Sequence, residues 1–192
     1  SLSSEYSVAP RRCLSTSIHR LRPRKSFTSG IAMSDYIVKN VPYIAQTTYE
    51  TCWLAAYKMM LAWKGKSQTL AEQLPDHQIM RVNGILDSQF LACRQALGLC
   101  SSTYTGFRDA DAIEGKLKSY GPIWVSGTYA KGHKHIVVLY GVRGSGDDAK
   151  VLIHDPATGM SITNPKPDWW PIGWFANRLN PVPYSCQHWF DV

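Results

Sequence analysis

The chain has 192 residues, of which 44% are hydrophobic, so it is long enough to bury the core of one domain. No apolar run approaches the roughly 18 residues that a membrane span needs, so we expect no membrane span. Residues 1–40 hold seven Lys and Arg against two acidic residues, so much of the formal net charge of +7 lies in a tail and does not indicate a nucleic-acid partner.

The N-terminal segment, residues 1–34, is rich in Ser and Arg, poor in acidic residues and without apolar periodicity. This composition predicts a flexible leader, because the segment has too few apolar side chains to fold by itself. It is typical of targeting peptides and of leaders read by an export machine, and a plain flexible tail is the alternative. We expect residues 35–192 to form the folded domain.

The first half of that domain is predicted to be helical. Residues 41–45 are expected to be extended, because Pro42 disfavours helix in the residue before it. After a polar turn, apolar residues at helical spacing predict a helix from Cys52 to Trp63, with Thr51 as N-cap and Gly65 at its end. Further helices are predicted over residues 69–83 with a turn at Pro75, over 86–97 and over 109–120.

The second half has the pattern of strands. Apolar runs bounded by glycine or proline predict strands over residues 123–125, 135–140 and 150–154, with a hairpin loop over 144–148. Helices followed by antiparallel strands indicate an α+β fold. The aromatic tail with Trp169, Trp170, Trp174 and Trp189 is expected to pack against this core; exposed tryptophans would favour a binding role.

The five cysteines form no disulfide framework and no CxxC metal spacing, so we expect mostly reduced thiols. A thiol attacks as the thiolate, and the start of a helix favours an anion through free N–H groups and the helix dipole. Cys52 is the cysteine placed at such a start, so it is the candidate nucleophile. Gln46, six residues earlier, has a side-chain amide that can serve as an oxyanion donor together with the backbone N–H of Cys52.

The candidate general base is His135, which opens an apolar strand. His133 is assigned to the preceding loop, because Gly132 and Lys134 flank it. The hairpin should bring Asp155 beside His135, where a carboxylate would fix the orientation of the ring, although Asp-Pro is also a common turn. A metal site formed by these residues and His154 is disfavoured, because successive strand residues point to opposite faces. We expect no cofactor.

The order Gln, Cys-Trp, His, Asp resembles the papain-like cysteine peptidases. The strings resemble in particular the AvrRpt2 family of effector proteases from plant-pathogenic bacteria and, more distantly, C39-like peptidases. They are Val41–Gln46, Cys52–Trp53, Gly121–Ile123, His135–Val142 and His154–Pro156 with Gly159.

The resemblance implies Cys52 as nucleophile, His135 as base, Asp155 as third member and Gln46 in the oxyanion hole. It implies a helical lobe packed on an antiparallel sheet lobe. It also implies a secreted effector or toxin that is delivered into a target cell and acts on a host protein or peptide. Residues 1–40 lack the Gly-Gly-Trp motif at which such proteins remove their own N-terminal segment, so self-processing by that rule is not supported.

Several related activities stay open at this point. Glutamine deamidation, transglutamination and peptidoglycan amide cleavage use the same Cys, His and Asp, because all pass through a thioester. A non-catalytic binding module on the same scaffold is a further alternative, which the intact quartet of Gln46, Cys52, His135 and Asp155 argues against.

Overall fold

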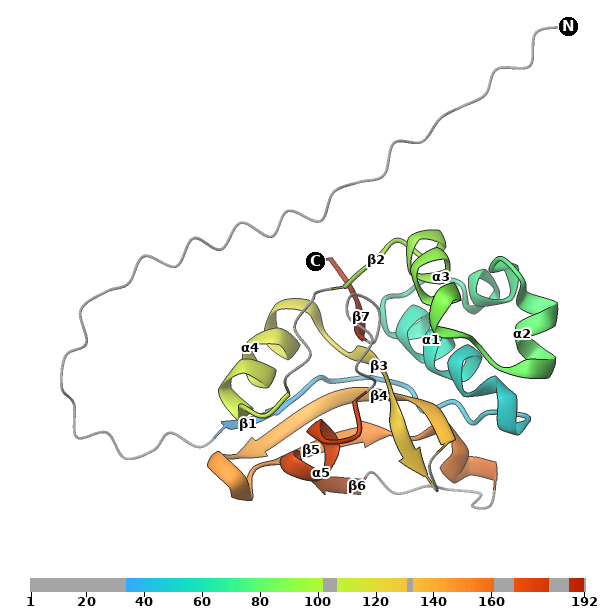
Figure 1. Ribbon diagram of the computed structural model, residues 1–192. Helices are drawn as coiled ribbons and strands as arrows, with labels where there is room; N and C mark the ends of the chain where they lie inside the picture. The colour runs from blue at the N-terminus through green and yellow to red at the C-terminus, as the bar shows by residue number, and fades with distance from the viewer. Residues whose placement is uncertain (1–33, 102–106, 131–132, 161–167, 180–186, 192) are drawn as a thin grey trace, which may run out of the picture.

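Helices form the first half of the folded region and antiparallel strands the second (Figure 1). The computed structural model describes residues 34–101, 107–130, 133–160, 168–179 and 187–191. The helices are α1 (Cys52–Trp63), α2 (His77–Asn83), α3 (Phe90–Ala96), α4 (Ala110–Tyr120) and α5 (Ile172–Ala176). The strands are β1 (Ser34–Ile37), β2 (Leu99–Cys100), β3 (Ile123–Ala130), β4 (His133–Gly144), β5 (Lys150–His154), β6 (Asp168–Pro171) and β7 (Gln187–Phe190). The predicted α+β fold is thus confirmed.

The sheet has the strand order β2-β7-β3-β4-β5-β6, and β1 pairs with β4. All of its pairings are antiparallel. Alternate residues of β4 belong to two different cores: Ile136 and Val138 pack with α1, whereas Val137 and Leu139 pack with α4. Strand alternation therefore lets one strand hold the helical lobe, formed by α1, α2 and α3, against the sheet lobe.

The helix α1 begins and ends where the sequence predicts. Most of its side chains are buried, including Cys52, Trp53 and Tyr57, so the helix is enclosed on nearly all sides. The indole N–H of Trp53 donates to the Met80 carbonyl at 3.3 Å and ties α1 to α2. Gly65 follows the helix with a φ of +70°, which stops it as expected.

The C-terminal strand β7 was not predicted, although it lies inside the sheet between β2 and β3. Its four residues are all buried, and two of them, Gln187 and His188, are polar. The His188 ring stacks on Trp124 with ring centroids 4.4 Å apart, and its Nδ1 lies 2.9 Å from the Tyr57 hydroxyl. These partners come from distant parts of the chain, so the local pattern gave no sign of the strand.

One expectation was wrong. His133 does not lie in a loop, because β4 begins there and its backbone pairs with Ala130, so the hairpin extends past its apolar run. The expectation of mostly reduced thiols agrees with the described residues, since Cys52 and Cys93 are free, but it did not include the disulfide bond of Cys100. Cys13 and Cys186 lie outside the described residues. Cys100 lies in β2, whose pairing with β7 depends on the distant C-terminal part of the chain.

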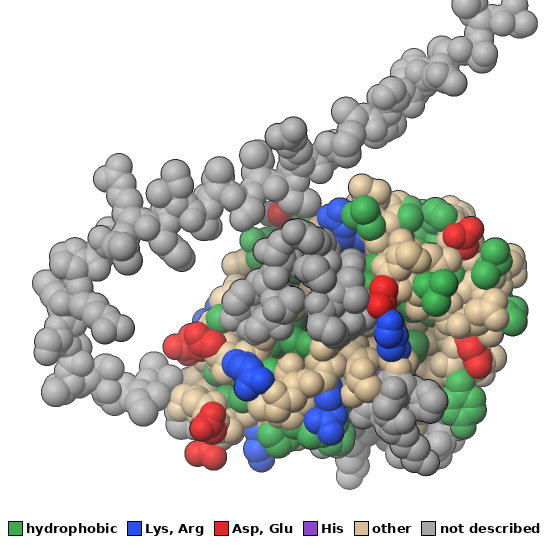
Figure 2. Space-filling model, in the orientation of Figure 1, with side chains coloured by type: hydrophobic (Ala, Val, Ile, Leu, Met, Phe, Trp, Pro, Cys, Tyr) green, Lys and Arg blue, Asp and Glu red, His purple; other side chains and the backbone are tan. Residues whose placement is uncertain are grey.

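The aromatic residues near the C-terminus pack as expected. Trp189 is buried, and Trp169, Trp170 and Trp174 lie partly buried against the core. On the face shown in Figure 2, acidic and basic side chains are interspersed. None of the helices that the structure describes is both long and apolar enough to cross a membrane.

The predicted leader joins the fold at Ser34, its last residue, which is already part of β1. Ser34 is buried, donates to Asp111 of α4 at 2.9 Å and pairs with Gly144 at the end of β4. Gly144 lies nine residue steps after His135 in β4, roughly 30 Å along a strand. The attachment point is therefore at the opposite end of the strand from His135.

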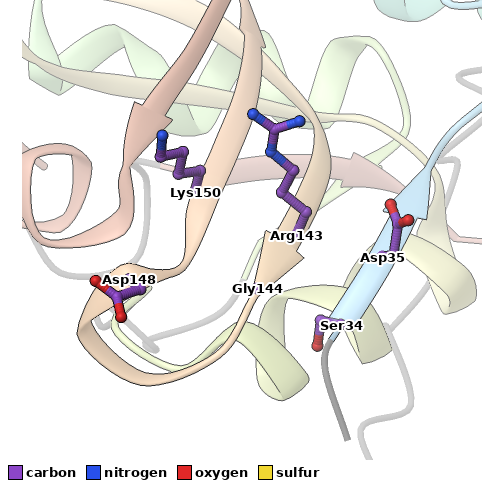
Figure 3. Close-up of a pocket in the computed structure, with 6 residues that line it drawn as sticks. All are labelled: Ser34, Asp35, Arg143, Gly144, Asp148 and Lys150. Carbon is purple, nitrogen blue, oxygen red and sulfur yellow. The ribbon is translucent and has the colours of Figure 1, made fainter.

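A surface hollow of about 500 Å³ lies at the same end of the sheet. Arg143 and Lys150 extend side by side from β4 and β5, and Asp35 projects from the neighbouring β1 (Figure 3). The hollow is lined by residues at the loop end of the β4–β5 hairpin, whereas His135 and Asp155 lie at the other end. It is therefore separate from the candidate catalytic residues.

We expect Gly121→Ala to lower the free energy of unfolding by about 3 kcal/mol. Gly121 ends α4 with a φ of +76°, and an added Cβ would lie 2.0 Å from Cη2 of Trp63, at the end of α1. Gly98→Ala is the matched control, because Gly98 also has a positive φ but no atom within 4 Å of such a Cβ. That control should lose about 1 kcal/mol. The free energies of unfolding are measured by urea denaturation. Equal losses in Gly121→Ala and Gly98→Ala would contradict the contact with Trp63.

Candidate active site

Cys52 is the first residue of α1 and is buried. The turn before it is organised by Thr51, whose Oγ1 accepts from the backbone N–H groups of Thr47 at 3.1 Å and Thr48 at 3.0 Å. The same hydroxyl donates to the Thr48 carbonyl at 3.0 Å. Thr51 makes no side-chain cap of the helix, so its role is to hold the turn that leads into Cys52.

His135 and Asp155 are brought together by the pairing of β4 with β5. Val138 lies opposite His154, so these two side chains point to one face of the sheet. Asp155 is the next residue along the chain and His135 is three residues before Val138, so both fall on the other face. His135 Nε2 lies 2.6 Å from Asp155 Oδ1. The same carboxylate oxygen accepts from the Ala157 backbone N–H at 2.8 Å, which fixes its position. The juxtaposition predicted from the hairpin is present.

The second partner of the His135 ring is the side chain of Cys52. Burial by itself would lower the pKa of His135, but hydrogen bonds to Asp155 and Cys52 and the charges of both groups raise it to about 9. Burial acts on Asp155 in the opposite sense, but the bond and charge of His135 hold the pKa of this carboxyl below its usual value. The ring therefore favours its protonated form between the two groups, and Nδ1 is the nitrogen left for Cys52.

Gln46 is buried beside the same turn. Its Nε2 donates to the carbonyl of Thr48 at 2.8 Å and contacts the carbonyl of Tyr49 at 3.3 Å. Its Oε1 has no hydrogen-bond partner among the described residues. The amide is thus close to the start of α1, and in this state its N–H groups point to backbone carbonyls.

His154, whose side chain the structure describes, does not join the cluster of His135 and Asp155. His154 donates from Nε2 to the Val41 carbonyl, 3.1 Å away, and stacks on Tyr140 with ring centroids 4.1 Å apart. Burial lowers the pKa of His154. The backbone of His133 is in β4, and its side chain lies outside what the structure describes. Among the described residues, no group of three or more His, Cys, Asp or Glu is placed to hold a metal ion.

Sequence reasoning missed two residues that shape the site. Thr51 was expected only as an N-cap, and Tyr43 was given no role. Tyr43 donates from its hydroxyl to the carbonyls of Asp155 at 3.1 Å and Pro156 at 3.3 Å. Its place in an apolar string close to Gln46 was the only signal, and that string does not reveal a partner more than a hundred residues away.

Comparison with known proteins places these residues in a family. The family described as Papain-like cysteine protease AvrRpt2 matches residues 35–167, which is more than half of the chain and includes Gln46, Cys52, His135 and Asp155. No curated protein matches the chain. The matched range runs from β1 through the hairpin that carries His135 and Asp155, in agreement with the papain-like arrangement of a helical and a sheet lobe. The chain therefore belongs to the AvrRpt2 family of papain-like cysteine proteases.

Proposed function

We propose that Cys52 is the nucleophile of this protease, that His135 is its general base and acid, and that Asp155 orients His135. The observation that carries the proposal is the position of the His135 ring, which lies 2.6 Å from Asp155 Oδ1 and close enough to Cys52 for that side chain to raise the pKa of the ring. An imidazolium held between two anions can stabilise a thiolate and later release a proton.

In the first half of the reaction, Sγ of Cys52 forms a bond to the carbonyl carbon of the substrate peptide, and the carbonyl electron pair moves to oxygen. His135 then gives its proton to the leaving nitrogen, the C–N bond breaks, and a thioester remains on Cys52. In the second half, His135 takes a proton from water as the water attacks the thioester. Sγ leaves as the thiolate and the acid product is released.

The oxyanion formed in both halves needs preorganised donors. We assign this role to the backbone N–H of Cys52 and the side-chain amide of Gln46. Nε2 of Gln46 donates to Thr48 at 2.8 Å, and its longer contact of 3.3 Å with Tyr49 is the one that the oxyanion would replace. Because both atoms belong to the turn and first residue of one helix, they can face the same oxygen.

The proposed hydrolysis is tested by incubating the protein with a peptide library and mapping new chain termini by mass spectrometry. We expect new termini with the native protein and with Cys93→Ala, a control that removes the second free, buried thiol among the described residues. Cys52→Ala should give none. A mass gain of about 1 Da at glutamine without new termini would instead show deamidation, and cross-linked peptides would show transglutamination.

We also propose that the protein is secreted as an effector and acts on a protein of a target cell. The Ser- and Arg-rich composition of residues 1–34 supports a role in export. The disulfide-bonded Cys100 supports passage through an oxidising compartment, because disulfides persist there. In this view the leader has no part in catalysis.

The role of the leader has a measurable consequence. A chain that begins at Met33 keeps β1 and should react with a thiol probe at Cys52 at the same rate as the full chain, because Ser34 is anchored roughly 30 Å along β4 from His135. It should also be retained inside the cells that produce it. Much faster labelling of the shorter chain would instead make the leader an inhibitory pro-segment.

A further inference from the structure

The segment between β1 and α1 follows the loop after β5 closely, although more than a hundred residues separate them in the chain. The contacts run in both directions: His154 Nε2 donates to the Val41 carbonyl at 3.1 Å, and the Tyr43 hydroxyl donates to the Asp155 carbonyl at 3.1 Å. The backbone N–H of Gln46 then donates to the Pro156 carbonyl at 3.1 Å. Residues 41–46, which we name the strap, thus contact the loop of Asp155 and continue along the chain into the turn before Cys52.

The two sides of this contact carry different parts of the proposed site. His135 and Asp155 are fixed to each other by the β4–β5 pairing, and Ala157 and Thr158 hold the Asp155 loop from within. None of these local bonds sets the distance between the His135–Asp155 pair and Cys52. The packing of Ile136 and Val138 on α1 holds the two lobes together, and the strap adds a direct link, because it is bonded to the loop after β5 and continues through Gln46 into α1.

We infer that Tyr43 is a positioning residue that holds the His135–Asp155 pair in register with Cys52 and Gln46. The inference rests on the proposed function, since it assigns a role relative to those four residues. Tyr43 is the strap residue whose side chain reaches the carbonyls of both Asp155 and Pro156. Its ring also meets the His154 ring edge to face, with centroids 5.4 Å apart, which sets the direction of the hydroxyl.

The test uses iodoacetamide as the probe and reads labelling of Cys52 by mass spectrometry. Tyr43→Phe keeps the ring and removes the hydroxyl, and it should slow the labelling of Cys52 at neutral pH about fivefold, the effect of one lost hydrogen bond. In a His135→Ala background the same change should have no effect, because the group that Tyr43 positions is gone. The matched control is Tyr36→Phe, because Tyr36 is also half-buried but lies in β1 opposite Val142. In this variant Cys52 should be labelled at the native rate.

The outcomes separate the inference from the proposed function. Slowing by Tyr43→Phe only when His135 is present supports positioning. The inference is overturned if Cys52 is labelled at the native rate in Tyr43→Phe. It is also overturned if Tyr43→Phe slows the labelling equally with and without His135. If Tyr43→Phe unfolds the protein, Cys93 should label as fast as Cys52, and that result assigns Tyr43 a structural role instead. If His135→Ala itself leaves Cys52 labelling unchanged, the proposed function fails, whereas slowing by His135→Ala without slowing by Tyr43→Phe removes only the inference.

Discussion

His135→Ala should lower the rate of peptide-bond hydrolysis by on the order of 10³- to 10⁶-fold, about as much as Cys52→Ala, because members of one catalytic unit are not additive. The ring of His135 lies between Asp155 and Cys52, so its removal leaves the thiol without a base and Asp155 without its side-chain partner. The rate is measured by following new termini from one peptide that the native protein cleaves.

The control for this loss is His133→Ala, which removes the histidine two residues earlier on β4. We expect it to keep at least about half of the native rate, the range of a substitution that removes no catalytic group. Loss of activity in His133→Ala with retention in His135→Ala would reverse the two assignments. It would also mean that β4 is paired with β5 in a register shifted by two residues.

Asp155→Asn should lower the rate by about 10²-fold, less than loss of His135, because the base remains while its orientation and charge partner are degraded. The change should also alter the pH dependence. Hydrogen bonds and charges from Asp155 and Cys52 raise the pKa of His135 to about 9, so the protonated ring persists to that pH in the native protein. With the charge of Asp155 removed, the pKa of His135 falls, and the alkaline limit of activity should move to lower pH.

The measurement is a pH profile of the cleavage rate for the native protein and for Asp155→Asn. Asp87→Asn is the matched control, since Asp87 lies in the 3-10 helix Asp87–Gln89 and forms an ion pair with Lys134, next to His135 in sequence. A partly exposed pair of this kind contributes little, so the control should keep the native profile. An alkaline limit that stays in place in Asp155→Asn would mean that the carboxylate does not support the protonated ring.

The sequence was informative where a signal is local. The helix Cys52–Trp63 was predicted with the correct ends, because polar turn residues precede it and Gly65 follows it. The meeting of His135 with Asp155 was predicted as well, since two strands joined by a short glycine-rich loop have little choice of register. In both cases the deciding residues lie close together in the chain.

The sequence failed where distant segments decide the outcome. Buried His188 is stabilised by Tyr57 and Trp124, and no pattern within β7 reveals those partners. The disulfide bond of Cys100 was missed because the spacing of cysteines does not report strand pairing. The direction of the Gln46 amide depends on two backbone carbonyls, Thr48 and Tyr49, in the exact shape of a turn.

The central claim is that Cys52 is activated by His135, and competitive labelling with iodoacetamide at neutral pH tests it most directly. Burial raises the pKa of Cys93 to about 11, so this second free thiol stays protonated and serves as an internal reference. In the native protein Cys52 should be labelled at least about tenfold faster than Cys93, and His135→Ala should remove most of that difference. Equal labelling of the two cysteines in the native protein, or an unchanged ratio in His135→Ala, would contradict the account.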